Sequence, residues 1–413
     1  MNPIIRTLWR NRFTASLSVL QMTIALAVVL NALSIFNARI ERSFRQTGME
    51  ETNLLTVKQT WVTEPDENGK VDSSSFIPRQ RADVAVLRSI PGVSGVSVTN
   101  SLPLAGWSRN GMLSRTPSDK FPKLETALYY ADDSLLKTLG AHIQQGRDFL
   151  ASEVRDMKSS DPISAGPIIV TRELAHTLFG NASALGQTLF VNGSASPSTI
   201  VGVLDNLQTP SRSAWGDRFA FNSVVVPARM ATDTTYFAIR VRPGELERVK
   251  ERVANALYEA STARVIEDDG VQSFTDIRSD AYRADRSMAW MMIVISAVFL
   301  VITASGVVGL TSFWVRKRQR SIGVRRALGA TRRDILVQFL AENTVLACSA
   351  SLLGAALTIA LNEVLMSHFE TARIHAIPTF IGMLVLVGIS LISSLIPSIR
   401  AAKVAPVVAI RDV

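Results

Sequence analysis

Long apolar runs alternate with polar regions along this chain, and they set its architecture. They occupy residues 15–39, 287–315, 332–365 and 378–399. A helix needs about 20 apolar residues, at about 1.5 Å per residue, to cross a hydrocarbon core. The pattern therefore predicts four transmembrane helices. A cleaved signal peptide is the alternative for the first run, but its length and the later runs favour an uncleaved anchor.

The long region between the first two apolar runs, residues 40–286, mixes strand and helix signals. Strands are predicted near residues 54–58, 93–99, 125–130, 168–170, 188–191, 199–203, 236–241 and 263–266, and helices near 78–89, 133–139, 172–179 and 245–258. The first and last of these elements form two similar strand–helix–strand units. We therefore expect an α+β domain with a discontinuous subdomain (about 40–122 and 215–286) and an inserted subdomain (about 123–214).

Helical spacing continues from Phe274 to Arg286 and runs directly into the second apolar run. This pattern predicts one continuous helix that could carry movement between the membrane and the α+β domain as a stalk. Within the run, Ser305 and Gly309 form a small-xxx-small pattern, which is typical of closely packed helices but weakly specific.

Positive charge is gathered beside the apolar runs. The chain has a net charge of +9, and fourteen Lys or Arg against two Asp lie in residues 1–14, 316–334 and 400–413. The positive-inside rule then places both termini and residues 316–331 in the cytoplasm, and residues 40–286 and 366–377 outside. Residues 1–14 also fit an amphipathic segment lying on the inner leaflet. The α+β region is slightly acidic, which argues against nucleic-acid binding.

The basic segment at residues 316–331 is predicted to hold a short helix near residues 319–328. Gly329 can end this helix, and Thr331 with Asp334 forms a capping box for the next one. On a helical wheel Ile322 falls among Arg318, Arg325 and Arg326, which favours a protein-docking surface over a loop that only touches lipid headgroups. The candidate docking residues are Ile322, Gly323, Val324, Arg325, Arg326, Ala327, Leu328 and Gly329.

Glu342 is the one acidic residue well inside an apolar run. A charge inside the bilayer costs roughly 2.5–3.5 kcal/mol at its centre. Two readings stay open: a polar contact to another span or to the basic segment, or a side chain that reaches the membrane interface.

Catalytic and metal-binding motifs are missing from the sequence. Gly69–Lys70 lacks the remainder of a Walker A motif, and Glu173 with His176 is a lone E-x-x-H. Cys348 is the single cysteine, so an intrachain disulfide is excluded. We therefore expect neither enzyme activity nor a cofactor or metal ion in this chain.

Residues 320–343, RSIGVRRALGATRRDILVQFLAEN, resemble the signature of the MacB/FtsX-type ABC transporter permeases. The resemblance extends to residues 130–149 and 168–203 of the outer domain and to the tail at 397–411. Ser321 departs from the glutamate usual in the family. This likeness identifies the chain as a member of the family, without a fused ATPase domain.

The resemblance implies a permease subunit in a bacterial inner membrane, paired with a second permease copy. A separate cytoplasmic ABC ATPase would bind ATP and Mg and push on the basic segment as a coupling helix. The family serves efflux of peptides or drugs with a periplasmic adaptor and outer-membrane channel, lipoprotein release, or cell-wall regulation. A membrane-anchored sensor and a membrane-tethered enzyme are the alternatives from other classes.

Overall fold

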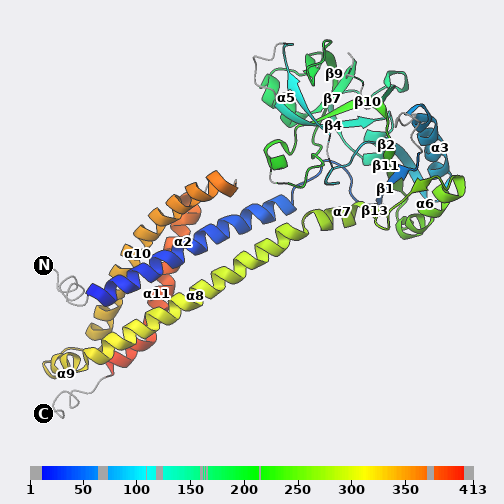
Figure 1. Ribbon diagram of the computed structural model, residues 1–413. Helices are drawn as coiled ribbons and strands as arrows, with labels where there is room; N and C mark the ends of the chain where they lie inside the picture. Colours follow the sequence, from blue (N-terminus) through cyan, green and yellow to red (C-terminus); the bar gives the residue numbers. More distant parts are fainter. Residues whose placement is uncertain are drawn as a thin grey trace. The chain divides into compact units, whose positions relative to one another are not determined.

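The computed structural model describes residues 12–63, 73–107, 109–117, 124–158, 161, 163, 166–213, 215–369 and 376–403. The predicted amphipathic segment up to residue 11, residues 370–375 of the predicted loop at 366–377 and the tail after residue 403 lie outside these residues. The described ends of that loop belong to the helices on either side of it. The chain divides into a membrane unit, Met1–Phe44 with Ala284–Val413, and an outer unit, Arg45–Arg283. Figure 1 shows the helices of the first and the mixed sheet of the second.

The membrane unit contains four helices long and apolar enough to span a bilayer, among the residues described. They are α2 (Arg12–Ser43), α8 (Arg283–Lys317), α10 (Arg332–Phe369) and α11 (Ala376–Ala402). Side chains from all four meet in one apolar cluster, which includes Leu26, Val307, Ala347 and Leu386. The four helices of this chain therefore share one apolar core.

Small residues allow α2 to approach its neighbours. A Cβ atom on Gly354 of α10 would lie 2.9 Å from Leu26, and one on Gly382 of α11 would lie 2.4 Å from Leu30. Such close approach is the usual way in which membrane helices gain packing energy. On α8 it is Gly306 that lies against α2, next to Gln21. Gly309, in the predicted small-residue pattern, has no neighbour near its Cβ position among the described residues.

The outer unit is built on a mixed sheet with the order β12-β1-β11-β2-β4-β3-β8-β9-β7-β10-β6, with β13 beside β1 and β5 beside β9. The strands are β1 (Leu54–Trp61), β2 (Val93–Thr99), β3 (Asn110–Ser114), β4 (Leu124–Ala131), β5 (Ile143–Gly146), β6 (Arg155–Lys158), β7 (Pro167–Thr171), β8 (Thr188–Val191), β9 (Ser198–Leu204), β10 (Ser223–Ala231), β11 (Thr234–Val241), β12 (Arg264–Val265) and β13 (Val271–Ser273). The helices are α3 (Phe76–Ser89), α4 (Leu135–Leu139), α5 (Arg172–Phe179), α6 (Leu246–Ala260) and α7 (Phe274–Ala281).

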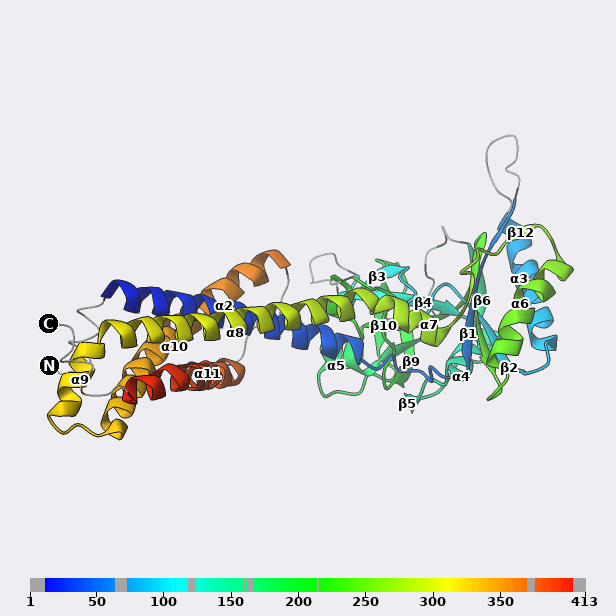
Figure 2. The same ribbon diagram turned by 90° about the horizontal axis from the view of Figure 1, so that it is seen from below.

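One face of strands β1, β11 and β2 is covered by helices α3 and α6, which lie side by side in both views (Figures 1 and 2). Val57 and Phe237 point to this face and pack with Leu87 of α3 and Val253 of α6. Because strand side chains alternate, the residues between them, such as Lys58 and Tyr236, emerge on the opposite face.

Strand β10 is the longest element that the sequence pattern does not reveal. It pairs in parallel with β4 and β6 and antiparallel with β7, so it lies inside the sheet. Its sequence has no polar–apolar alternation and contains Pro227, which normally argues against a central strand. Strand β3 is likewise missed, because it lies within a stretch that reads as a Gly/Ser/Pro-rich loop.

The predicted continuous stalk from Phe274 into the membrane is wrong, because the helix is interrupted at Tyr282. Helix α7 ends there, and α8 begins at Arg283. The Tyr282 ring is buried in the core of the outer unit, and its hydroxyl accepts a hydrogen bond from Gln208 at 3.1 Å. Because the Tyr282 side chain is anchored in this core, α7 ends here. Helix α7 therefore belongs to the outer unit.

A buried ion pair joins β12 to α3 in the outer unit. Arg264 Nη1 lies 2.9 Å from Asp83 Oδ1 and donates to Gln59 Oε1 at 2.7 Å. The guanidinium also stacks over the Trp61 ring, 4.2 Å from its centre. Burial raises the pKa of Asp83 above its usual value, although hydrogen bonds from Gln59 and Arg264 oppose this rise. Desolvation therefore makes burial of the ion pair costly. Removing only one of the two charged side chains costs more, because the other charge stays buried without a partner.

Replacing Asp83 by asparagine should lower the free energy of unfolding of the outer unit by about 3–5 kcal/mol, because Arg264 keeps its charge without its counter-ion. Thermal unfolding of the full chain in detergent would measure the change. The double variant Asp83→Leu with Arg264→Met should recover most of the loss. A double variant as unstable as Asp83→Asn would contradict this account.

Candidate functional site: a basic helix held against the membrane helices

The basic segment forms a separate short helix, α9 (Gln319–Ala327), at the end of α8. Gly329 follows it with φ of +102°, a left-handed conformation that suits glycine and turns the chain. Thr331 Oγ1 then accepts from the backbone N–H of Asp334 at 3.2 Å, and Asp334 accepts from the backbone N–H of Thr331 at 2.9 Å. These reciprocal bonds start α10, so α9 is flanked by two well-defined ends.

The inner face of α9 packs on the membrane helices. Ile322 is 4% exposed and packs with Val315 of α8, Phe339 of α10 and Ala401 of α11. Gly323 is also buried. The expectation that Ile322 belongs to a docking surface is therefore wrong, and its role is to anchor the helix. A helical wheel contains only the residues of α9, so it places Ile322 among arginines. It does not include the apolar surfaces of the three neighbouring helices, which bury Ile322.

Three arginines reinforce this contact. Arg318, just before α9, places Nη1 2.7 Å from Glu342 Oε2 of α10. Arg325 Nη1 donates to Gln338 Oε1 at 2.8 Å. Arg326 Nη1 donates to the Ala402 carbonyl at the end of α11, at 3.1 Å. Helix α9 is thus joined by polar contacts to both α10 and α11.

Glu342 makes the contact to the basic segment and does not reach the interface as an exposed side chain. Its side chain is 1% exposed, and Gln338 donates to its second oxygen at 3.3 Å. A buried carboxylate needs such partners to stay ionised. The sequence left two interpretations of Glu342 open. The structure agrees with a polar contact to the basic segment and not with a side chain that reaches the membrane interface.

The outer face of α9 combines positive charge with exposed apolar side chains. Val324 is 47% exposed, and Leu328, which caps the end of α9, is 83% exposed. Arg320, Arg325 and Ala327 are exposed beside them. Singly exposed apolar residues are common, but here they share one short helix with arginines. A surface of this composition suits contact with another protein better than contact with water alone.

A second ionic cluster lies at the opposite end of α2 and α8. Asp285 is 6% exposed, and its two oxygens lie 2.8 Å from Arg39 Nη1 and 3.4 Å from Arg42 Nη1. This cluster joins the two helices where the chain enters and leaves the outer unit. This cluster is not among the sites predicted from the sequence, although an acidic residue and two basic residues that flank separate apolar runs are a usable signal for it.

No metal centre accompanies these features in the part of the chain that the structure describes. It contains no group of three or more His, Cys, Asp or Glu side chains placed to hold an ion. Glu173 and His176 lie on α5, and neither has a second such motif nearby. The distinctive chemistry of the membrane unit is therefore ionic contact between helices.

The architecture is that of a permease-like membrane protein. It has four apolar helices, a basic helix packed against them and a large α+β domain that follows the first helix. Residues 15–256 match the model of the MacB-like periplasmic core domain, and residues 293–406 match that of the FtsX-like permease C-terminal region. The chain belongs to the MacB/FtsX-type ABC transporter permeases, and it is an inner-membrane protein.

Two similar proteins carry ABC transporter names. The chain is 24% identical to the uncharacterized ABC transporter permease YvrN of Bacillus subtilis, over 98% of this chain and 97% of that one. It is 26% identical to the macrolide export ATP-binding/permease protein MacB of Pasteurella multocida, over 84% of this chain but only 50% of that one. The periplasmic region of MacB from Actinobacillus actinomycetemcomitans aligns with a TM-score of 0.33 and 13% identity, covering 58% of this chain and 97% of that one.

Glu342→Gln should lower the free energy of unfolding of the membrane unit by about 3–5 kcal/mol, because Arg318 then lacks its counter-ion. The melting temperature of the full chain in detergent would report the loss. Glu342→Leu combined with Arg318→Met should restore most of the stability. An unchanged melting temperature for Glu342→Gln would show that the ion pair does not hold α9 in place.

Proposed function

We propose that this chain is the permease subunit of an ABC transporter that passes ATP-driven movement from a separate cytoplasmic ATPase to its outer domain. The observation that supports the proposal best is α9. Its inner face is fixed to three membrane helices, whereas its outer face presents Leu328, Val324 and Arg320. A helix built in this way can receive a push from a partner and transfer it to the helices behind it.

The proposal includes an orientation. Both chain termini and α9 lie in the cytoplasm, and residues 45–283 lie in the periplasm. The arginines and lysines beside the membrane helices support this topology, because positive residues are retained on the cytoplasmic side. The match to a periplasmic core domain supports it from the other side of the membrane.

Movement of α9 has three routes into the membrane unit. The chain itself continues into α8 and α10, the Arg318–Glu342 pair leads into α10, and the Arg326 contact leads into α11. At the far end, Asp285 ties α8 to α2 through Arg39 and Arg42. We infer that α2 and α8 move together, because both are attached to the outer domain and to this cluster.

The partners and the cargo follow from the family and are part of the proposal. A second permease copy, identical or related, would complete the membrane portion, and ATP with Mg would be bound by the ATPase and by no group in this chain. The names of two relatives, macrolide export for MacB and pyoverdine export for PvdT of Pseudomonas aeruginosa, support efflux of peptides, drugs or other periplasmic substrates. Such export would use a periplasmic adaptor and an outer-membrane channel.

The outer domain would act through two subdomains. Two apolar cores support this division: one lies under α3 and α6, and another surrounds β7, β9 and β10 with α5. A third core, which includes Leu54, Ile169 and Ala238, draws on both subdomain ranges and joins them. We propose that the second core belongs to the inserted subdomain of residues 123–214. Strand β10, which follows that range, contributes to the same core and closes it.

Leu328→Asp should weaken binding of the ATPase by about 30-fold, because truncating a central apolar contact typically costs about 2 kcal/mol. Co-purification from the native host and the ATPase activity of the complex would measure it. Lys403→Glu is a matched control, since it alters an exposed residue beyond α11 and not α9. Equal loss in both variants, or no loss for Leu328→Asp, would reject α9 as the docking helix.

Asp285→Asn should leave ATPase binding unchanged and reduce the ATP-dependent movement of the outer domain, because α2 and α8 lose their shared counter-ion. Hydrogen exchange of residues 45–283 in the complex, measured with and without ATP, follows that movement without a known substrate. Glu41→Gln, an exposed carboxylate on α2 close to Arg42 in sequence, is the control. An ATP response of normal size in Asp285→Asn would argue against joint movement of the two helices.

A further inference from the structure

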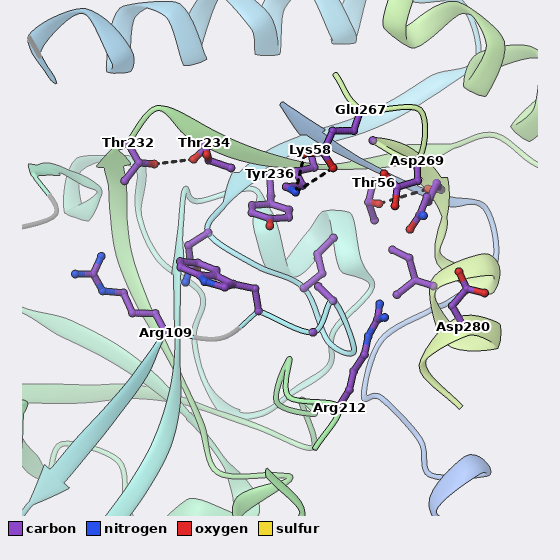
Figure 3. A pocket seen from close by; sticks show the side chains of 18 of the residues that line it. Thr56, Lys58, Arg109, Arg212, Thr232, Thr234, Tyr236, Glu267, Asp269 and Asp280 are labelled. Carbon is purple, nitrogen blue, oxygen red and sulfur yellow. Dashed lines mark hydrogen bonds and ion pairs between the residues drawn. The ribbon is translucent and has the colours of Figure 1, made fainter. Parts of the chain in front are cut away.

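The outer unit contains a cavity of about 960 Å³ that sequence analysis did not anticipate. Its floor is the face of the sheet opposite helices α3 and α6. Thr56 and Lys58 of β1 and Thr234 and Tyr236 of β11 line it, and Figure 3 shows their side chains converging on one space. Lys58 is paired directly with Tyr236 in the strand register. A volume of this size is typical of ligand sites.

The cavity walls are loops that are tied to one another. The backbone N–H of Gly106 donates to the Pro210 carbonyl at 2.9 Å, and Arg212 Nε donates to the Leu104 carbonyl at 2.5 Å. On the opposite side, the Gly270 carbonyl accepts from the backbone N–H of Lys58 at 2.8 Å. These bonds hold the walls in place without a ligand, so the space is preformed.

An aromatic pair lies in the middle of the cavity. The rings of Trp107 and Tyr236 stack with centres 6.5 Å apart and planes 9° from parallel. Trp107 remains 54% exposed although it lines the cavity, so one side of the pair is open to a further ring. Burial raises the pKa of the Tyr236 phenol above its usual value, so the platform is uncharged at neutral pH.

Charged side chains line both sides of the aromatic pair. In Figure 3, Arg109 lies on one side of Tyr236, and Asp269, Asp280 and Arg212 lie on the other, where Arg212 offsets the charge of Asp280. Glu267 is neutralised by Lys58 at 3.4 Å, whereas Asp269 has no hydrogen-bond or ion-pair partner among the described residues. Exposed carboxylates can stay solvated, but this one borders a preformed cavity that also holds an aromatic platform.

The strand order gives the scale of the site. Asp269 precedes β13 and Arg109 precedes β3, and the strands between them run β13-β1-β11-β2-β4-β3. Five steps of about 4.8 Å give at most about 24 Å along the sheet. An extended chain rises about 3.3–3.6 Å per residue, so a ligand as long as about seven residues would reach both ends.

We propose that this cavity binds an extended zwitterionic ligand that carries an aromatic ring between its charged ends. The ring would stack on Trp107, the cationic end would lie at Asp269, and the anionic end would lie at Arg109. The site is independent of the proposed coupling through α9, because binding needs no ATPase. Failure of one proposal therefore leaves the other intact.

The probe is a heptapeptide of six glycines with phenylalanine at its centre and free termini. Three relatives isolate each feature: an N-acetylated form without the positive end, a C-amidated form without the negative end, and a form with leucine in place of phenylalanine. Calorimetry on the full chain in detergent should detect the free heptapeptide with a dissociation constant below about 1 mM. It should bind more tightly than each of the three relatives.

Variants of the chain assign the ends. Trp107→Ala should weaken binding about three- to tenfold, and Trp107→Phe should retain it, because a ring is kept. Asp269→Asn should weaken binding of the free peptide about two- to fivefold but leave binding of the N-acetylated form unchanged. Arg109→Gln should weaken binding of the free peptide to a similar extent but leave binding of the C-amidated form unchanged. Asp268→Asn is the matched control, since this neighbouring carboxylate does not line the cavity.

Three results would overturn the proposal: no binding of the heptapeptide up to about 1 mM, equal affinity for the free and capped peptides, or normal binding by Trp107→Ala. The melting temperature of each variant shows whether it is folded. If Trp107→Ala does not fold, the two charge variants with their capped peptides decide the question alone.

Discussion

A carboxylate inside a membrane helix is tolerated only where a cation or a set of donors offsets the cost of removing it from water. In this chain Glu342 meets that requirement with Arg318 and Gln338. Because Arg318 immediately precedes α9, satisfying the carboxylate also fixes the start of the basic helix. The burial of Ile322 then fixes its rotation. The exposed positions of α9 follow from these two constraints, and so does the surface that we propose for partner docking.

The outer unit shows how one sheet can serve two purposes. Period-two alternation along β1 and β11 sends Val57 and Phe237 into a core and Lys58 and Tyr236 into a cavity. Stability comes from the first face, which α3 and α6 cover. The second face is therefore free to carry charged and aromatic side chains without weakening the core. The buried Arg264–Asp83 pair lies near the edge of the same sheet and secures β12 against α3.

Much of the fold could be predicted because its signals are local. Apolar length indicated the membrane helices, and turn chemistry at Gly329 and Thr331 indicated where α9 ends and α10 begins. Predictions failed where distant parts of the chain decide the outcome. The burial of Ile322 depends on Phe339 and Ala401, the position of β10 depends on strands on both sides, and the helix break depends on the core around Tyr282. The cavity depends on loops from four regions of the sequence, so no single motif announces it.

The end of α7 at Ala281 and the end of α2 at Ser43 have a consequence for how the outer unit can vary. The outer unit begins at Arg45 and closes at Arg283, and it keeps its own cores, its own ion pairs and its own cavity. Only two covalent connections join it to the membrane unit. Because its cores lie within residues 45–283, sequence changes inside this unit can alter its surfaces and loops while the packing of the membrane helices stays the same.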